Sequence, residues 1–203
     1  MFCGQFRHGR SIERAYGNGC GAEGALRSTV VTVYVPSGIV VAADSRVVGA
    51  RTQQRQVEGQ TGSIEHRFMA TDHAYRITEL QDLPVGIGTY DMAVLWNEPV
   101  GVHIRRFEEA GLAPGDDVAS VPPKLVSYFL QRRPGQPVGF LVTGHRHEGK
   151  LPAPYVYACQ IVHQTEPQRV NVDQQGNIQY GVLRGGDTQV INRLIVADAL
   201  APF

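Results

Sequence analysis

The feature that most constrains the fold is a pair of short apolar segments early in the chain. The segments are STVVTVYV at residues 28–35 and GIVVAAD at residues 38–44, and only Pro36 and Ser37 separate them. Both segments are apolar and contain runs of β-branched residues, and Pro-Ser is a turn sequence. The pattern therefore predicts a hairpin of two largely buried strands.

The residues before this hairpin have a different composition. Residues 1–27 are rich in Gly and Arg and show little hydrophobic periodicity. We interpret them as a flexible, propeptide-like leader that precedes a single domain over residues 28–203. The leader begins without the apolar stretch of a secretory signal, and no apolar run of the chain approaches the ~18 residues of a membrane span.

Charge and cysteine usage exclude some classes of partner. The formal net charge is zero, so no long-range field would attract nucleic acid or an anionic membrane, and we expect neither as a partner. Cys3, Cys20 and Cys159 are odd in number and form no zinc or CxxC pattern. A reduced, cytoplasmic location fits this usage best.

Beyond the hairpin, the sequence predicts blocks of strands that alternate with blocks of helices. Residues 49–66 are polar with three glycines, and we expect a loop there. Helical spacing runs from Thr89 to Ala110 with a break at Pro99, and a second helix is expected over about 115–132. A last helix is expected to follow GGDT (185–188) and to end near Leu200. Further short strands are expected at 67–71, 75–78, 84–88, 138–143, 155–162, 168–172 and 178–183. This order indicates an α+β domain with antiparallel sheets.

The spacing of four residues in the first hairpin resembles a known family. Ser28 is followed by Gly38 ten positions later, by Asp44 sixteen positions later and by Arg46 eighteen positions later. This segment resembles the first hairpin of proteasome β-type subunits, which are N-terminal-nucleophile (Ntn) hydrolases whose mature chain begins with Thr. GTYDMAVL, VGFLVTG and GVLRGGDT keep the family's order further along, so that the resemblance covers about residues 28–195.

The resemblance implies a fold and an activity. The fold would be a four-layer αββα sandwich of two antiparallel sheets flanked by helices. The activity would be hydrolysis of peptide or amide bonds after removal of the leader, with the hydroxyl of the first mature residue as nucleophile. The α-amine of that residue, whose ordinary pKa is about 8, would act as the base. No metal and no organic cofactor would be needed.

Residue by residue, the resemblance gives six candidate site positions. Ser28 matches the nucleophile, Asp44 the acid beside it, and Arg46 that acid's neighbour. Arg67, in HRFMAT, matches the lysine that the acid holds, and backbone N–H groups near Ile87 and Gly88 would border the oxyanion site. The six positions are Ser28, Asp44, Arg46, Arg67, Ile87 and Gly88.

The alternative to an active hydrolase is a non-catalytic ring or scaffold subunit. Arg27 precedes Ser28 where active family members usually have glycine, and Gly185 stands where the family has a helper serine. Under both readings the resemblance implies a homo-oligomeric ring, with unfolded protein or peptide as substrate of the active form and an ATPase or activator as a further partner. The chain stops at Phe203, before the family's last helix and edge strands, and a shortened C-terminus is expected.

Overall fold

The structure is a computed structural model of the whole chain, and it describes residues 28–57, 60–71, 74–95, 98–132, 134–149 and 151–186, with side chains in 47–73 and at Leu151 left out. Within these ranges most of the chain is β-structure. The main sheets are a five-stranded sheet, a three-stranded sheet and a long two-stranded ribbon.

The three-stranded sheet contains the predicted first hairpin. Strand β1 (Thr29–Val35) lies between β2 (Gly38–Ala43) and β12 (Gly181–Gly186), and both pairings are antiparallel. The hairpin itself is confirmed, but its burial is one-sided. Val30, Thr32 and Tyr34 are buried, whereas the alternate residues of β1 are exposed or half-buried. This alternation is typical of a sheet with one covered face.

The five-stranded sheet has the order β11-β10-β9-β6-β5 and is antiparallel throughout. Its long strands β9 and β10 pair over their whole length. The bounds of its strands are β5 Ile77–Glu79, β6 Val85–Asp91, β9 Val138–Glu148, β10 Leu151–Gln160 and β11 Gln164–Arg169.

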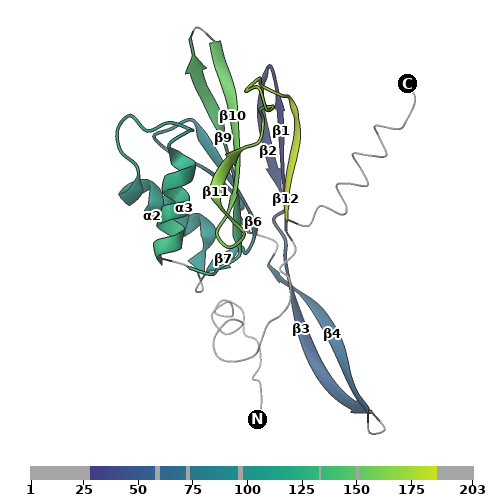
Figure 1. Ribbon diagram of the computed structural model, residues 1–203. Coiled ribbons are helices and arrows are strands. Elements are labelled where there is room, and N and C mark those ends of the chain that lie inside the picture. Colours follow the sequence, from purple (N-terminus) through teal and green to yellow (C-terminus); the bar gives the residue numbers. More distant parts are fainter. Residues whose placement is uncertain are drawn as a thin grey trace, which may run out of the picture.

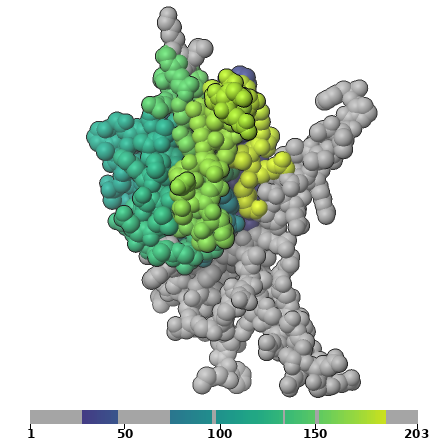
Figure 2. All heavy atoms as spheres, viewed as in Figure 1, coloured from purple at the N-terminus to yellow at the C-terminus, as the bar shows by residue number. Residues whose placement is uncertain are grey.

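Two helices cover one face of the five-stranded sheet, and the three-stranded sheet covers the other (Figure 1). They are α2 (Val100–Gly111) and α3 (Val121–Arg132). The core between the helices and the sheet is aromatic: the rings of Phe129 and Phe140 lie 4.9 Å apart, and Phe107 is fully buried beside them. Figure 2 shows the helices, β9–β11 and β12 adjoining on one face of the molecule.

The expectation of a four-layer αββα sandwich is wrong. In the described residues both helices lie on the same side, which makes three layers, and the outer face of the three-stranded sheet carries the exposed valines Val33, Val40 and Val182. The expected last helix after residues 185–188 falls at residues outside the described ranges.

Two further segments form strands where the sequence predicted a helix or a loop, so the protein has more β-structure than expected. The first predicted helix was to begin at Thr89, but β6 continues to Asp91, the short strands β7 (Val94–Leu95) and β8 (Glu98–Pro99) follow, and the helix begins only after Pro99. Pro99 is therefore the N-cap of α2, a position that tolerates a residue without a backbone N–H.

The polar segment 49–66 was expected to be a loop, and that expectation is also wrong. It lies within a long antiparallel ribbon of β3 (Val47–Val57) and β4 (Gln60–Thr71). Figure 1 shows this ribbon extending away from the packed sheets, and its two strands pair with each other rather than with any other sheet. Pairing satisfies the backbone N–H and C=O groups that the two strands turn toward each other, and water can satisfy those that point outward, so a polar sequence can form strands without burying an apolar face.

Candidate active site

Ser28 lies immediately before β1, at the junction of the two main sheets. Its side chain is buried, with 1% of the residue exposed, and its hydroxyl donates a hydrogen bond to the backbone carbonyl of Asp91 over 3.3 Å. The carbonyl of Ser28 lies against Gly186, where a Cβ would collide with it, and Gly186 has a φ of +81°. Only glycine meets both conditions easily, so this neighbour fixes the start of β1.

Asp44 lies beside the residue that follows Ser28. Its Oδ1 accepts a hydrogen bond from the backbone N–H of Thr29 over 3.2 Å, and its own N–H donates to the Thr29 carbonyl over 3.1 Å. These bonds extend the β1–β2 ladder by one residue pair. The carboxylate therefore has a fixed place next to Ser28, with 39% of the side chain exposed.

Arg76 supplies the positive charge at this place. Its Nε lies 3.1 Å from Asp44 Oδ1, and its side chain is 0% exposed. The contact is an ion pair without the alignment of a hydrogen bond, and in the described part of the chain Nη1 and Nη2 have no hydrogen-bond partner. Burial lowers the pKa of Arg76, while the charges of Asp44 and Asp91 oppose that effect. An arginine so buried still carries its proton at any ordinary pH.

Asp91 ends β6 and is the only non-glycine residue with positive φ among those described, at +66°. Its Oδ2 accepts a hydrogen bond from the side-chain amide of Gln160 over 2.6 Å. Burial raises the pKa of this carboxyl, although the hydrogen bond from Gln160 and the charges of His163 and Arg76 act against the rise. Left-handed backbone at a residue with a side chain is uncommon and marks a place that the surrounding fold holds firmly.

Tyr90 packs beneath the end of β12. Its ring occupies the space where a Cβ would lie at Gly139 or Gly185, and its hydroxyl donates to the carbonyl of Cys159 over 3.5 Å. Burial raises the pKa of Tyr90 to about 12. At Gly185, where the resemblance places a helper serine, this ring leaves no room for a side chain.

The predicted site residues are only partly brought together. Ser28 and Asp44 lie on either side of Thr29, whereas Arg46 is exposed after β2. Arg67 lies on β4 opposite Ala50, and its side chain is outside the described part of the structure.

Ile87 and Gly88 lie in mid-strand of β6, between β5 and β9. Ile87 is fully buried in the core on the helix side, and a Cβ at Gly88 would meet Val30 and Val41 on the other side. Gly88 is three residues from Asp91, about 10 Å along an extended strand. The backbone group that contacts the Ser28 hydroxyl is the carbonyl of Asp91, and the assignment of Ile87 and Gly88 to an oxyanion site stays a prediction.

Sequence reasoning missed Arg76 and Asp91. Arg76 falls in YRIT, a short expected strand, and nothing in its spacing from Ser28 sets it apart. Its neighbours Tyr75 and Ile77 are apolar yet exposed, so the sequence carries no signal that Arg76 is buried. Asp91 lies in GTYDMAVL, where the helical pattern obscured the strand end.

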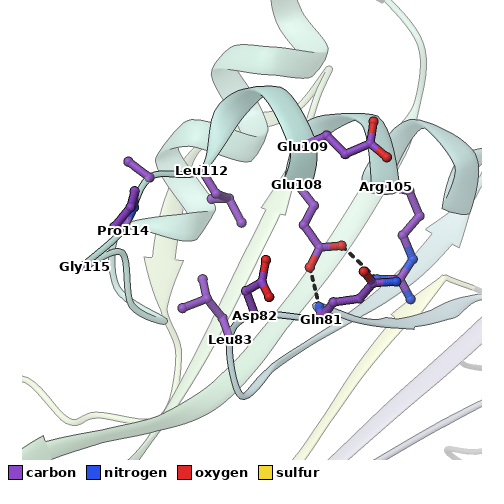
Figure 3. Close-up of a pocket in the computed structure, with 10 residues that line it drawn as sticks. Gln81, Asp82, Leu83, Arg105, Glu108, Glu109, Leu112, Pro114 and Gly115 are labelled. Atoms are coloured by element: carbon purple, nitrogen blue, oxygen red, sulfur yellow. Dashed lines mark hydrogen bonds and ion pairs between the residues drawn. The ribbon is translucent and has the colours of Figure 1, made fainter.

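A separate cavity of about 710 Å³ lies at the turn between β5 and β6 and the C-terminal end of α2 (Figure 3). Glu108 points into it, receives a hydrogen bond from the Gln81 backbone and pairs with Arg105 at 2.8 Å. None of its lining residues is a serine, threonine, cysteine or histidine, and none belongs to the Ser28 site. We therefore place the candidate chemistry at Ser28 rather than in this cavity.

No protein-family model matches the chain, and no curated protein matches it either. Among the described helices, none has the length and apolar character needed to cross a membrane. Within the same residues, no three histidine, cysteine or acidic side chains lie close enough together to bind a metal ion.

Proposed function

We propose that this chain is an Ntn-type hydrolase of peptide or amide bonds, with the Ser28 hydroxyl as nucleophile once the residues before it have been removed. The observation that carries the proposal is the convergence of polar groups from the ends of β2, β5 and β6 on the start of β1. Asp44 contacts Thr29, Arg76 contacts Asp44, and the Asp91 carbonyl accepts the Ser28 hydroxyl.

The proposed reaction begins with addition of Ser28 Oγ to the carbonyl carbon of the substrate, while the hydroxyl proton passes to the free α-amine of Ser28. The C–N bond then breaks, the leaving nitrogen takes that proton, and the acyl group remains on Oγ as an ester. Water hydrolyses the ester and restores the hydroxyl. Removal of the leader follows the same bond changes with the carbonyl of Arg27 as the acyl group, and the new α-amine takes the proton.

Asp44 and Arg76 would favour this chemistry electrostatically. The guanidinium of Arg76 is buried, so its charge acts through a medium of low dielectric constant. Asp44 joins it to the backbone of Thr29 and keeps the pair in place. A fixed positive charge near the nucleophile stabilises the alkoxide that forms as Oγ loses its proton. Arg76 thus takes the role that the resemblance suggested for Arg67.

A non-catalytic ring or scaffold subunit remains the second candidate, and one observation favours it. Ser28 is 1% exposed, and its hydroxyl is already donated to a backbone carbonyl. In a chain that keeps its leader, Ser28 has no free α-amine, and its hydroxyl holds the start of β1 against the end of β6. In either role we propose assembly into a homo-oligomeric ring in the cytoplasm, with an ATPase or activator as a further partner, and light scattering at micromolar concentration tests that assembly.

The test compares the wild type with Ser28→Ala, and Ser37→Ala in the exposed β1–β2 turn is the matched control. We expect intact mass to show loss of residues 1–27 in the wild type and the control, and retention in Ser28→Ala. Peptidase activity should follow the same division. A wild type that keeps its leader, with any peptidase activity equal in Ser28→Ala, would contradict the hydrolase and favour the scaffold.

A further inference from the structure

The Ser28 hydroxyl is held by a backbone carbonyl at the end of a strand. Ser28 Oγ donates to the carbonyl of Asp91 over 3.3 Å, and Asp91 is the last residue of β6. Strand ends open more readily than residues in mid-strand. The place of this carbonyl, and with it the place of Ser28 Oγ, therefore depends on what holds Asp91.

Gln160, the last residue of β10, holds the side chain of Asp91. Its Nε2 donates to Asp91 Oδ2 over 2.6 Å, although β9 lies between β6 and β10 in the sheet. The β9 residue opposite Gln160 is Gly139, which is also opposite Tyr90 of β6. A glycine leaves this face of β9 open, so that side chains from the two flanking strands can meet over it.

Tyr90 crosses β9 at the same place. Its ring occupies the space of a Cβ at Gly139, and its hydroxyl donates to the carbonyl of Cys159 over 3.5 Å. Two consecutive residues of β6 are thus tied to two consecutive residues of β10. The bond from Gln160 is the shorter of the two and its acceptor is a carboxylate, so it is the stronger tie.

The same bond affects the charge of Asp91. Burial raises the pKa of this carboxyl, and the hydrogen bond from Gln160 opposes the rise more than the charges of His163 and Arg76 do. Gln160 therefore favours the ionised carboxylate, which is the form that accepts its hydrogen bond most strongly.

From these contacts we infer that Gln160 is a positioning residue for the nucleophile: it holds Asp91, and the Asp91 carbonyl in turn keeps Ser28 Oγ in one place. The inference rests on the proposed function of Ser28. A serine side chain has three staggered rotamers, and the bond to a fixed carbonyl selects one of them. The O–H bond can still turn about Cβ–Oγ toward the α-amine. Loss of Gln160 spreads Oγ over several positions, which slows the chemical step without weakening substrate binding.

The first arm of the test measures rates in the full chain and in the processed protein. Intact mass over time gives the rate of leader loss, and kcat and KM are measured on the tripeptide coumarin amide that the wild type hydrolyses fastest. We expect Gln160→Ala to lower both the rate of leader loss and kcat about tenfold, the effect of one hydrogen bond to a charged group, and to leave KM within about twofold. Gln164→Ala is the matched control, because Gln164 lies opposite Gln160 on β11 and donates to the Ala158 carbonyl instead.

The second arm restores the bond in a pH-dependent form. In Gln160→Glu a protonated carboxyl can donate to Asp91 as the amide does, whereas an ionised one repels it. Two adjacent carboxylates share a proton with one pKa raised, so kcat relative to the wild type should be near one at about pH 5 and fall about tenfold by about pH 8. The charges of Arg76 and His163 act on Asp91 in both proteins, so their titration largely cancels in this ratio. Thermal unfolding at each pH verifies that both proteins are folded during the assay.

The outcomes separate the two proposals. If the wild type keeps its leader and hydrolyses no amide, the function of Ser28 fails and the role of Gln160 fails with it. If the wild type is active and folded Gln160→Ala has the wild-type kcat, or loses affinity rather than kcat, Ser28 stands and the positioning role is overturned. If Gln160→Ala does not fold, the Gln160→Glu profile decides: a fall from pH 5 to pH 8 supports the inference, and a ratio constant with pH overturns it.

Discussion

The ring of Tyr90 fills the volume that any side chain at Gly185 would need: a Cβ added there would lie 2.5 Å from Tyr90 Cδ1. Gly185 is opposite Val30 in the β1–β12 ladder, so the contact ties the end of β6 to the strand that Ser28 begins. The aromatic ring and the glycine are complementary in shape, and each restricts the other.

Gly185→Ser is therefore expected to destabilise the fold by about 1–3 kcal/mol, the usual cost of overpacking a filled site. Thermal unfolding measures the loss, and Gly38→Ala is the control because nothing lies within 4 Å of a Cβ at Gly38. The double variant Gly185→Ser, Tyr90→Ala should lose less stability than the sum of the two single losses, since neighbouring sites couple. A double variant whose loss equals the sum of the single losses would show that the two residues do not share one space.

Arg76→Met and Asp44→Asn are expected to differ in stability. The guanidinium of Arg76 is buried with two unpartnered Nη groups, so a methionine of similar length should leave stability within about 1 kcal/mol of the wild type or raise it. Asp44→Asn removes the partner and leaves the buried cation behind, which we expect to cost about 2 kcal/mol, a value reduced by the exposure of Asp44. Chemical denaturation ranks the two variants.

The same pair distinguishes stability from activity. Arg76→Met should retain the fold and yet slow the loss of residues 1–27, because the positive charge near Ser28 is gone. Intact mass over time measures this rate. Processing at the wild-type rate in a folded Arg76→Met protein would remove Arg76 from the proposed mechanism.

Asp91 is expected to make stability fall as pH rises. Its folded pKa lies above its ordinary 3.8, so between those two values the folded state binds more protons than the unfolded state, and the free energy of unfolding decreases with increasing pH. The penalty is absent below about pH 3.8 and complete above the folded pKa. Asp91→Asn has no such penalty, so its unfolding temperature relative to the wild type should be higher at pH 7 than at pH 3.5, and a constant difference would contradict the raised pKa.

The β3–β4 ribbon should exchange its amide hydrogens much faster than the paired strands β9 and β10. An isolated two-stranded hairpin is at best marginally stable, and among the described strands β3 and β4 pair only with each other. Hydrogen exchange followed by mass spectrometry checks this, with peptides from 138–160 as the internal reference. Protection of residues 47–57 equal to that of β9 would show that the ribbon has a partner in solution.

The first hairpin could be predicted from sequence because its information is local. β-Branched residues, a Pro-Ser turn and alternation fix β1 and β2 without reference to the rest of the chain. The stretch after Thr89 could not be predicted in this way. Its apolar spacing suits a helix, but β6 lies between β5 and β9, and these nonlocal pairings outweigh the local preference up to Asp91.

Arg76 shows why the site was harder to predict than the strands. In this segment the apolar Tyr75 and Ile77 point outward, and Arg76 and Thr78 point inward. Hydrophobic alternation predicts the opposite register, because a shift of one residue moves every side chain to the other face. What favours the observed register is the carboxylate of Asp44, which no pattern near Arg76 reveals.

The site around Ser28 also has a consequence for when the chain can react. Ser28 is made early in synthesis, but Asp44, Asp91 and Gln160 reach it from the ends of β2, β6 and β10. The last of these residues leaves the ribosome only after most of the chain has been translated. A nascent or misfolded chain has the serine without its surroundings, so any reactivity of this hydroxyl is a property of the finished fold and cannot precede it.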